Sequence, residues 1–290
     1  MTFIQPTSWA EALEARAEHP EAVVVAGGTD VMVECNFGRL RPPALLDLSR
    51  VEELRASSRE NGQVRVGSGV TYAQILRDLP GDLPALALAA RTVGSPLIRN
   101  RGTIGGNLGS ASPAGDCHPP LLACGAEVEL SSIHASRTVP VADYFRGPKQ
   151  SVLGPDELIA AVWAPAATGP QTFSKVGSRN AMVIAICSFA LALHPETGRV
   201  GTGIGSAGPV PFRARRAEEF LEGHLGEVGA WDSRSPLSDA VVDHFGRLVA
   251  EAARPIDDVR GSADYRRHAL GVLARRSLSW CWEDYRGKVA

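Results

Sequence analysis

The stretch TIGGNLGSASPAGD, Thr103 to Asp116, decides how this chain is interpreted. It holds four glycines and three hydroxyl residues and offers almost nothing to a hydrophobic core. A related segment, AGGTD at Ala26–Asp30, follows the apolar run AVVVA. Paired glycines let neighbouring backbone N–H groups converge on an anion, because one glycine can adopt positive φ without strain. We therefore interpret both segments as phosphate-binding turns, although a lone Gly-Gly pair is more often an ordinary turn.

The residues after the second glycine pair extend this interpretation. Ser110, Ser112 and Asp116 can reach polar parts of a ligand, and a carboxylate is a natural acceptor for ribose hydroxyls. Two such turns and one acid predict a dinucleotide site, with Gly105 placed so that any Cβ there blocks the ligand. The alternative for Asp116 is the N-cap of a following helix, and both roles can coexist.

Other nucleotide-binding motifs are missing from the chain. Neither glycine segment fits G-x-G-x-x-G with an acid about 20 residues later, and no P-loop is present. The two glycine segments therefore suit a diphosphate that is bound and retained better than one that is hydrolysed. Cys117 and His118 adjoin the site, but we expect structural roles for both and no metal ligation.

The composition excludes several classes of protein. The 290 residues are 44% hydrophobic and 21% charged with a net charge of −2, which is typical of a soluble globular protein without a basic nucleic-acid surface. No apolar run reaches the roughly 18–20 residues of a membrane span, and no signal peptide is recognisable. We therefore expect a cytoplasmic protein. The five scattered cysteines argue against disulfides, zinc or an iron–sulfur cluster on this chain.

Periodicity and capping residues predict mixed secondary structure. Ser8 and Glu11 form a capping box before a helix at Trp9–Glu18. A Gly/Pro-rich stretch near Ala164–Pro170 is the best domain boundary. Further helices are expected at Thr71–Leu79, Pro84–Val93, just after Asp116 and throughout the C-terminal part; strands are expected at Ala22–Ala26, Pro43–Ser49, Gln63–Gly69, Ala126–Leu130, Ser188–His194 and Arg199–Gly208.

Four motifs in order resemble a known family: VVVAGGTDVMVE, IRNRGTIGGNLGSASPAGD, DELIAAVWAP and FSKVGSRNAMVIA. Together they resemble the FAD-binding medium subunit of molybdenum hydroxylases, above all stand-alone FAD subunits of xanthine dehydrogenase-type enzymes. The segment RPIDDVRGSADYRRHALGVLARRSL resembles the family's flavoprotein C-terminal domain. The resemblance implies an α+β fold with two FAD-binding subdomains of the PCMH/vanillyl-alcohol-oxidase type, followed by a C-terminal sheet-plus-helices domain. The expected ranges are 1–55, 56–168 and 169–290.

The resemblance also implies the residues that hold non-covalent FAD. Both glycine segments are expected to enclose the diphosphate, Asp116 to hold the ribose or ribityl region, and Lys175 to approach the flavin, where it could stabilise negative charge. The aliphatic contact to the flavin is expected from Ile159, beside Leu158. The implied cofactor-binding residues are Val25, Ala26, Gly27, Gly28, Thr29, Asp30, Val31, Met32, Thr103, Ile104, Gly105, Gly106, Asn107, Ser112, Asp116, Leu158, Ile159 and Lys175.

The implied function is electron transfer, with no catalytic residue or metal on this chain. A molybdopterin-binding large subunit oxidises the substrate, and electrons cross a [2Fe–2S] small subunit to FAD and then to NAD⁺ or another acceptor. The expected assembly is a heterotrimer that can dimerise. Alternatives are a carbon monoxide dehydrogenase-like or aromatic or N-heterocycle hydroxylase, a stand-alone flavin oxidase, or a non-catalytic nucleotide-binding module. Trp280, Trp282 and Tyr285 are expected to pack, or to form part of a subunit interface.

Overall fold

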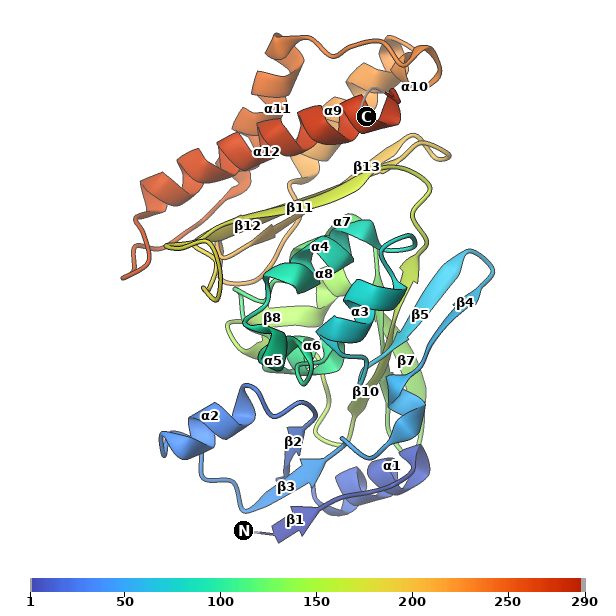
Figure 1. The fold of residues 1–290 in the computed structure, drawn as a ribbon, viewed down its shortest axis with the longest axis vertical. Helices are drawn as coiled ribbons and strands as arrows, with labels where there is room; N and C mark the ends of the chain where they lie inside the picture. Colours follow the sequence, from blue (N-terminus) through green and yellow to red (C-terminus); the bar gives the residue numbers. More distant parts are fainter. Residues whose placement is uncertain (1, 288–290) are drawn as a thin grey trace.

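The computed structural model describes residues 2–287 and has the α+β fold that the sequence predicted. Three sheets follow one another along the chain and lie one above another in Figure 1, with the C-terminal helices above the last sheet. A short pair of strands, β8 (Phe145–Gly147) and β9 (Gln150–Ser151), completes the strand pairing. Each sheet has its own hydrophobic cluster, so the fold is built from three packed parts.

The N-terminal part is a small parallel sheet with the order β1-β3-β2. Its helix α1 begins where predicted, because the Ser8 hydroxyl accepts from the Glu11 N–H at 3.2 Å. The Glu11 carboxylate accepts from the Thr7 N–H at 2.8 Å instead of from Ser8, so only half of the predicted capping box forms. The elements are β1 (Thr2–Ile4), α1 (Trp9–Glu18), β2 (Val23–Val25), α2 (Val31–Asn36), β3 (Ala44–Asp47) and the 3₁₀ helix η1 (Glu52–Arg55).

The middle part is an antiparallel sheet with the order β4-β5-β10-β6-β7. Helix α3 has a complete capping box, in which Thr71 and Gln74 bond each other's backbone N–H. The strands are β4 (Ser57–Glu60), β5 (Gln63–Gly67), β6 (Glu127–Ser131), β7 (Ser136–Pro140) and β10 (Leu158–Pro165); the helices are α3 (Tyr72–Asp78), α4 (Pro84–Thr92), α5 (Pro96–Arg99), α6 (Ile104–Ser110), α7 (His118–Ala123) and α8 (Val141–Tyr144).

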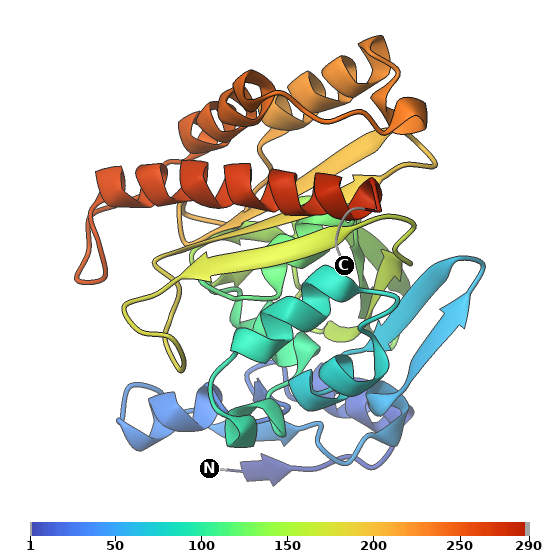
Figure 2. The same ribbon diagram turned by 45° about the horizontal axis from the view of Figure 1, so that its top comes forward.

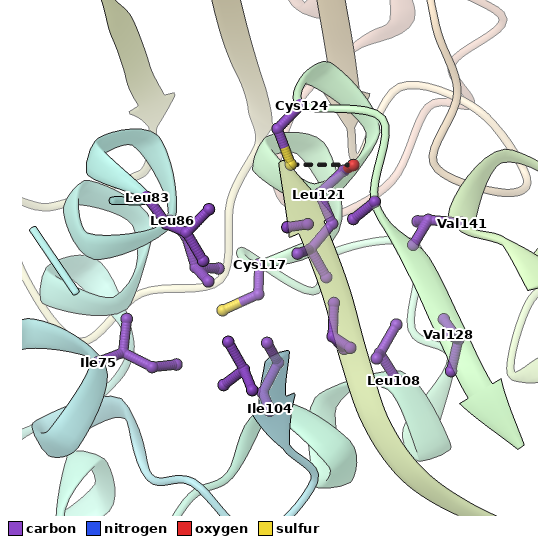
Figure 3. Packing of buried hydrophobic residues seen from close by; sticks show 14 of the residues in the cluster. Ile75, Leu83, Leu86, Ile104, Leu108, Cys117, Leu121, Cys124, Val128 and Val141 are labelled. Atoms are coloured by element: carbon purple, nitrogen blue, oxygen red, sulfur yellow. Dashed lines mark hydrogen bonds between the residues drawn. The ribbon is translucent and has the colours of Figure 1, made fainter. Parts of the chain in front are cut away.

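The helices of the middle part pack against this sheet around a dense apolar core. Figure 3 shows Ile104 and Leu108 of α6 facing Cys117 and Leu121, with Ile75 of α3 closing one side. Cys117 and Cys124 are buried in this core, and Cys187 and Cys281 in the C-terminal one. All four act as small apolar residues, and burial raises the pKa of the Cys124, Cys187 and Cys281 thiols to about 12.

The C-terminal part is a three-stranded antiparallel sheet, β11-β12-β13, covered by helices on one face (Figures 1 and 2). The alternation of large and small residues in β12 has a direct cause. Phe189 and Leu191 face the covering helices, whereas Ala190 and Ala192 pack with Ala89 and Ala123 of the middle part. The elements are β11 (Gln171–Val176), β12 (Cys187–His194), β13 (Arg199–Gly205), α9 (Arg215–Glu227), α10 (Ala230–Ser233), α11 (Asp239–Ala252) and α12 (Ala263–Tyr285).

The C-terminal aromatic residues divide into buried and exposed ones. Trp282 is 1% exposed and donates from Nε1 to the Ser235 carbonyl at 2.8 Å, and Tyr285 donates to the Trp231 carbonyl at 2.8 Å. Both pack with Trp231, as expected. Trp280 is 53% exposed and takes no part in this cluster.

Glycines of β13 bring the middle and C-terminal parts into close contact. A Cβ on Gly201 would overlap the Ala123 carbonyl oxygen, and one on Gly203 would overlap that of Pro119. Both carbonyls belong to α7, so the helix lies directly on the strand backbone. We propose to keep the predicted division at residues 55 and 168, since these positions follow η1 and separate β10 from β11.

Candidate functional site

The first glycine segment forms the loop between β2 and α2. Of its two glycines only Gly28 has positive φ, at 74°. Within the part of the chain that the structure describes, no protein group accepts from the backbone N–H of Gly28, Thr29 or Asp30. Neighbouring unpaired donors of this kind suit an anion, which agrees with the predicted phosphate-binding turn.

The second glycine segment differs from the prediction, because it begins helix α6 instead of forming a turn. Neither Gly105 nor Gly106 has positive φ, and Thr103 is the N-cap. The N–H of Gly105 donates to the Ser68 carbonyl at 2.9 Å, and that of Gly106 to the Thr103 hydroxyl at 3.0 Å. These donors are therefore already used within the protein. The segment offers a smooth glycine surface, not a second set of free N–H groups.

The two segments lie against each other, although 76 residues separate Gly27 from Thr103 in the chain. A Cβ on Gly27 would overlap the carbonyl oxygen of Arg101 and come within 3.0 Å of the Gly102 Cα. Gly27 thus permits the loop of the N-terminal part to touch the segment that leads into α6. The two motifs predicted to act together are adjacent in space.

Asp116 forms a buried ion pair with Lys175. Its Oδ2 accepts from Lys175 Nζ at 2.5 Å and from the Thr92 hydroxyl at 3.3 Å, and the two charged side chains are 10% and 9% exposed. Burial raises the pKa of the Asp116 carboxyl, and the nearby ammonium opposes this shift. The alternative N-cap role is wrong, because α7 begins after Cys117 with no side-chain cap bond.

These features border one large cavity of about 760 Å³. The volume is within the usual range for a cofactor pocket. Two of its bordering residues carry buried oxygens without a protein partner in residues 2–287, Asn107 Oδ1 and Asp116 Oδ1. The predicted residues that line the cavity are Ala26, Gly27, Gly28, Thr29, Asp30, Val31, Thr103, Gly105, Gly106, Asn107, Ser112, Asp116, Leu158 and Ile159.

Four predicted residues do not line the cavity, namely Val25, Met32, Ile104 and Lys175. Val25 and Ile104 are buried side chains, and Ile104 belongs to the core of the middle part. Met32, on α2, is 41% exposed but stands outside the cavity lining. Lys175 lies behind Asp116, where its ammonium also donates to the Thr92 carbonyl at 3.1 Å and the Val183 carbonyl at 3.2 Å.

Several cavity residues were not predicted from the sequence. Gly109 follows Gly106 by three positions and therefore lies on the same face of α6, which is a signal that helical spacing could have revealed. Met182, Val183 and Ile184, in the loop between β11 and β12, border the cavity from the C-terminal part. The remaining unpredicted polar or aromatic side chains are Arg16, Ser68, Tyr72 and Ser95, whereas Ser110, which also lines the cavity, was expected to reach the ligand.

The expected structural role of His118 agrees with its surroundings. The ring is 0% exposed, lies 4.6 Å from the Phe145 ring, and its Nε2 is 3.2 Å from the Asn107 carbonyl oxygen. Burial lowers the pKa of His118 to about 4, so the imidazole is neutral. Among the described residues no cluster of three or more possible metal ligands occurs.

A cavity bordered by an anion-binding loop, a glycine-faced helix and a buried carboxylate is typical of a nucleotide-cofactor-binding protein. Residues 1–167 match the FAD binding domain in molybdopterin dehydrogenase, and residues 172–281 match the CO dehydrogenase flavoprotein C-terminal domain. The chain belongs to this family: it is an FAD-binding medium subunit of the molybdenum hydroxylases, and thus an oxidoreductase subunit.

Individual relatives cover almost the whole chain. The xanthine dehydrogenase FAD-binding subunit of Escherichia coli O157:H7 is 29% identical over 96% of this chain and 94% of its own. The glyceraldehyde dehydrogenase medium chain of Sulfolobus acidocaldarius is 30% identical over 96% of both chains. Among solved structures, carbon monoxide dehydrogenase from Hydrogenophaga pseudoflava matches with a TM-score of 0.88 and 26% identity, over 100% of this chain and 98% of that one. Within residues 2–287 no helix is both long and apolar enough to cross a membrane.

Proposed function

We propose that this protein passes electrons from a [2Fe–2S] partner subunit through non-covalently bound FAD to NAD⁺ or another acceptor, in a xanthine dehydrogenase-type complex. A molybdopterin-binding partner would oxidise the substrate, and the three subunits would form a heterotrimer. Two xanthine dehydrogenase FAD-binding subunits, at 29% and 28% identity, support this type. The glyceraldehyde dehydrogenase, nicotine 6-hydroxylase and carbon monoxide dehydrogenase medium chains are equally similar, at 27% to 30%.

The single observation that carries the proposal is the cavity itself, because its chemistry fits FAD. The free N–H groups of the loop at Gly28 suit one side of the diphosphate, and the glycine face of α6 leaves room for the other. The unpartnered Oδ1 atoms of Asn107 and Asp116 can accept from hydroxyl or amide donors of the cofactor. An apolar wall at Ile159 completes a site for a ring system.

Bound FAD supplies the ability to exchange electrons one at a time or in pairs. The chain's own residues bind the cofactor, orient it and set its electrostatic surroundings. Lys175 does not reach the cavity in this arrangement, so we propose that it acts on the flavin through Asp116, whose charge it balances and whose carboxylate it fixes.

The test is a comparison of the isolated chain with the assembled complex. The isolated protein should purify yellow, release FAD on denaturation, and be bleached by NADH but not by xanthine. Xanthine should bleach it only when both partner subunits are present. Bleaching of the isolated chain by an organic substrate would instead establish a stand-alone oxidase, and a protein that takes up no flavin would refute the proposal. Carbon monoxide, an aldehyde and an N-heterocycle, offered to the complex in turn, separate the other substrate classes.

A further inference from the structure

Arg16, near the end of α1, borders the cavity although nothing in the sequence singled it out. It is only 9% exposed. Its Nη1 donates to the Ala22 carbonyl at 2.8 Å, and its buried Nε has no partner among the described residues. Asp156 and Glu21 act on its charge only from longer range, and no ion pair joins it within residues 2–287.

An incompletely bonded guanidinium of this kind is costly to bury. The carbonyl end of α1 and the Ala22 bond offset part of the cost. Burial lowers the pKa of Arg16, because the rest of the cost of burying the charged guanidinium is not offset. A hydrophobic residue of similar volume would fill the same space without that cost. Nη2 makes no hydrogen bond within the described residues and, unlike Nε, is not fully buried, so it indicates a ligand group that accepts a hydrogen bond at this end of the cavity.

The position of Arg16 determines which part of the ligand that is. Asp116 and the loop at Met182 border the cavity beside the C-terminal part, whereas α1 lies at the opposite, lower end of the molecule in Figure 1. The glycine segments meet between these two ends. With the diphosphate at the glycine segments and the flavin half towards Asp116, the adenosine half extends towards Arg16. The walls there, Val23 and Val24, are apolar and suit the faces of a purine.

Resting on the proposed function, we infer that Arg16 recognises the adenine ring of FAD, with a free guanidinium N–H donating to a purine ring nitrogen. Arg16 is thus a positioning and specificity residue that favours FAD over FMN, which lacks the adenosine half. The energy spent on burying the guanidinium is recovered only when the base is bound. The apo protein and the FAD-bound protein should therefore respond in opposite directions to its removal.

The experiment compares wild type, Arg16→Met and Arg276→Met as full-length chains stripped of flavin. Arg276 is an exposed arginine of α12, well away from the cavity, and serves as the matched control. Binding of FAD and of FMN is measured separately by flavin fluorescence, and the melting temperature of each apo protein by calorimetry. We expect the Kd for FAD to rise about tenfold in Arg16→Met, with the Kd for FMN and the melting temperature of the apo protein unchanged or improved.

Each other outcome overturns the inference. Equal loss of FAD and FMN affinity, or a lower apo melting temperature with unchanged FAD affinity, would make Arg16 a purely structural residue. Unchanged affinity for both flavins would remove Arg16 from the site. If the wild type binds FMN and FAD equally well, the adenosine half is not recognised at all. If wild type binds neither flavin, the proposed function itself is refuted, which is a distinct result.

Discussion

The two adjacent glycines of α6 should respond differently to the same substitution. Gly105 points into the protein: a Cβ there would lie 2.5 Å from the Ser68 Cβ and 2.6 Å from the Ser68 carbonyl oxygen. Gly106 is exposed on the cavity side, and a Cβ there would meet only the Thr103 hydroxyl, at 3.1 Å. We therefore predict that Gly105→Ala damages the fold, whereas Gly106→Ala damages FAD binding. This reverses the expectation from the sequence, which placed the ligand-blocking position at Gly105.

The magnitudes follow from these contacts. Ordinary van der Waals contact begins at 3.4 Å, so Gly105→Ala forces α6 away from the Ser68 backbone oxygen by about 0.8 Å. Overpacking of this kind costs about 1–3 kcal/mol, and about 2–4 °C in melting temperature per kcal/mol for a domain of this size. At Gly106 the methyl group gains helix propensity of up to about 1 kcal/mol, so stability is retained. Its intrusion towards the cofactor should raise the Kd for FAD about tenfold.

The assay is thermal unfolding of the flavin-free proteins together with FAD titration of each. Gly223→Ala in α9 is the matched control, because this exposed helix glycine lies outside the cavity lining and a Cβ there would meet no atom within 4 Å. The reasoning is refuted if Gly105→Ala keeps the wild-type melting temperature and loses FAD affinity. It is equally refuted if Gly106→Ala binds FAD as tightly as wild type.

Two further predictions concern buried titratable groups. Lys175→Met leaves the Asp116 carboxylate buried without its cation, which should lower the free energy of unfolding in urea by about 3–5 kcal/mol. The double variant with Asp116→Asn should recover part of this loss. An unchanged urea midpoint in the single variant would contradict the prediction. Burial lowers the pKa of His118 from 6.5 to about 4, so between these values the unfolded state takes up a proton that the folded state does not. The free energy of unfolding should therefore fall by about 3 kcal/mol as pH drops through this window, and His118→Gln should flatten that dependence; parallel pH curves for the two proteins would rule it out.

Local signals in the sequence predicted much of the fold. Ser8 and Thr71 place the starts of α1 and α3 because each hydroxyl accepts from the backbone N–H three residues later. Periodicity predicted a strand at Ser188–His194, where β12 forms, and the structure assigns each of its faces to different neighbours. These features depend on residues close together in the chain, which is why a sequence can reveal them.

Features that depend on contacts between distant residues were harder to predict from the sequence. Glycine is a poor helix former, so IGGNLGS was interpreted as a turn; α6 nevertheless forms because its glycines allow close packing on Ser68 and its N–H groups find acceptors. The Lys175–Asp116 pair joins residues 59 apart, and Arg16 has the spacing of an ordinary surface arginine. The residues of both glycine segments were predicted to lie together, and most of them line one cavity; their contacts with the cofactor remain a prediction.

The glycine face of β13 also limits how the molecule can move. With Gly201 and Gly203 in direct contact with the carbonyls of α7, sliding or rotation of the C-terminal sheet would drive main-chain atoms into one another. Hinge bending between the two parts is therefore suppressed at this contact. Adjustment at the Asp116 end of the cavity is left to the connection between β11 and β12, which carries Met182 and Ile184, each 53% exposed. Because β13 is held against α7, any adjustment around the cofactor falls to the loop between β11 and β12.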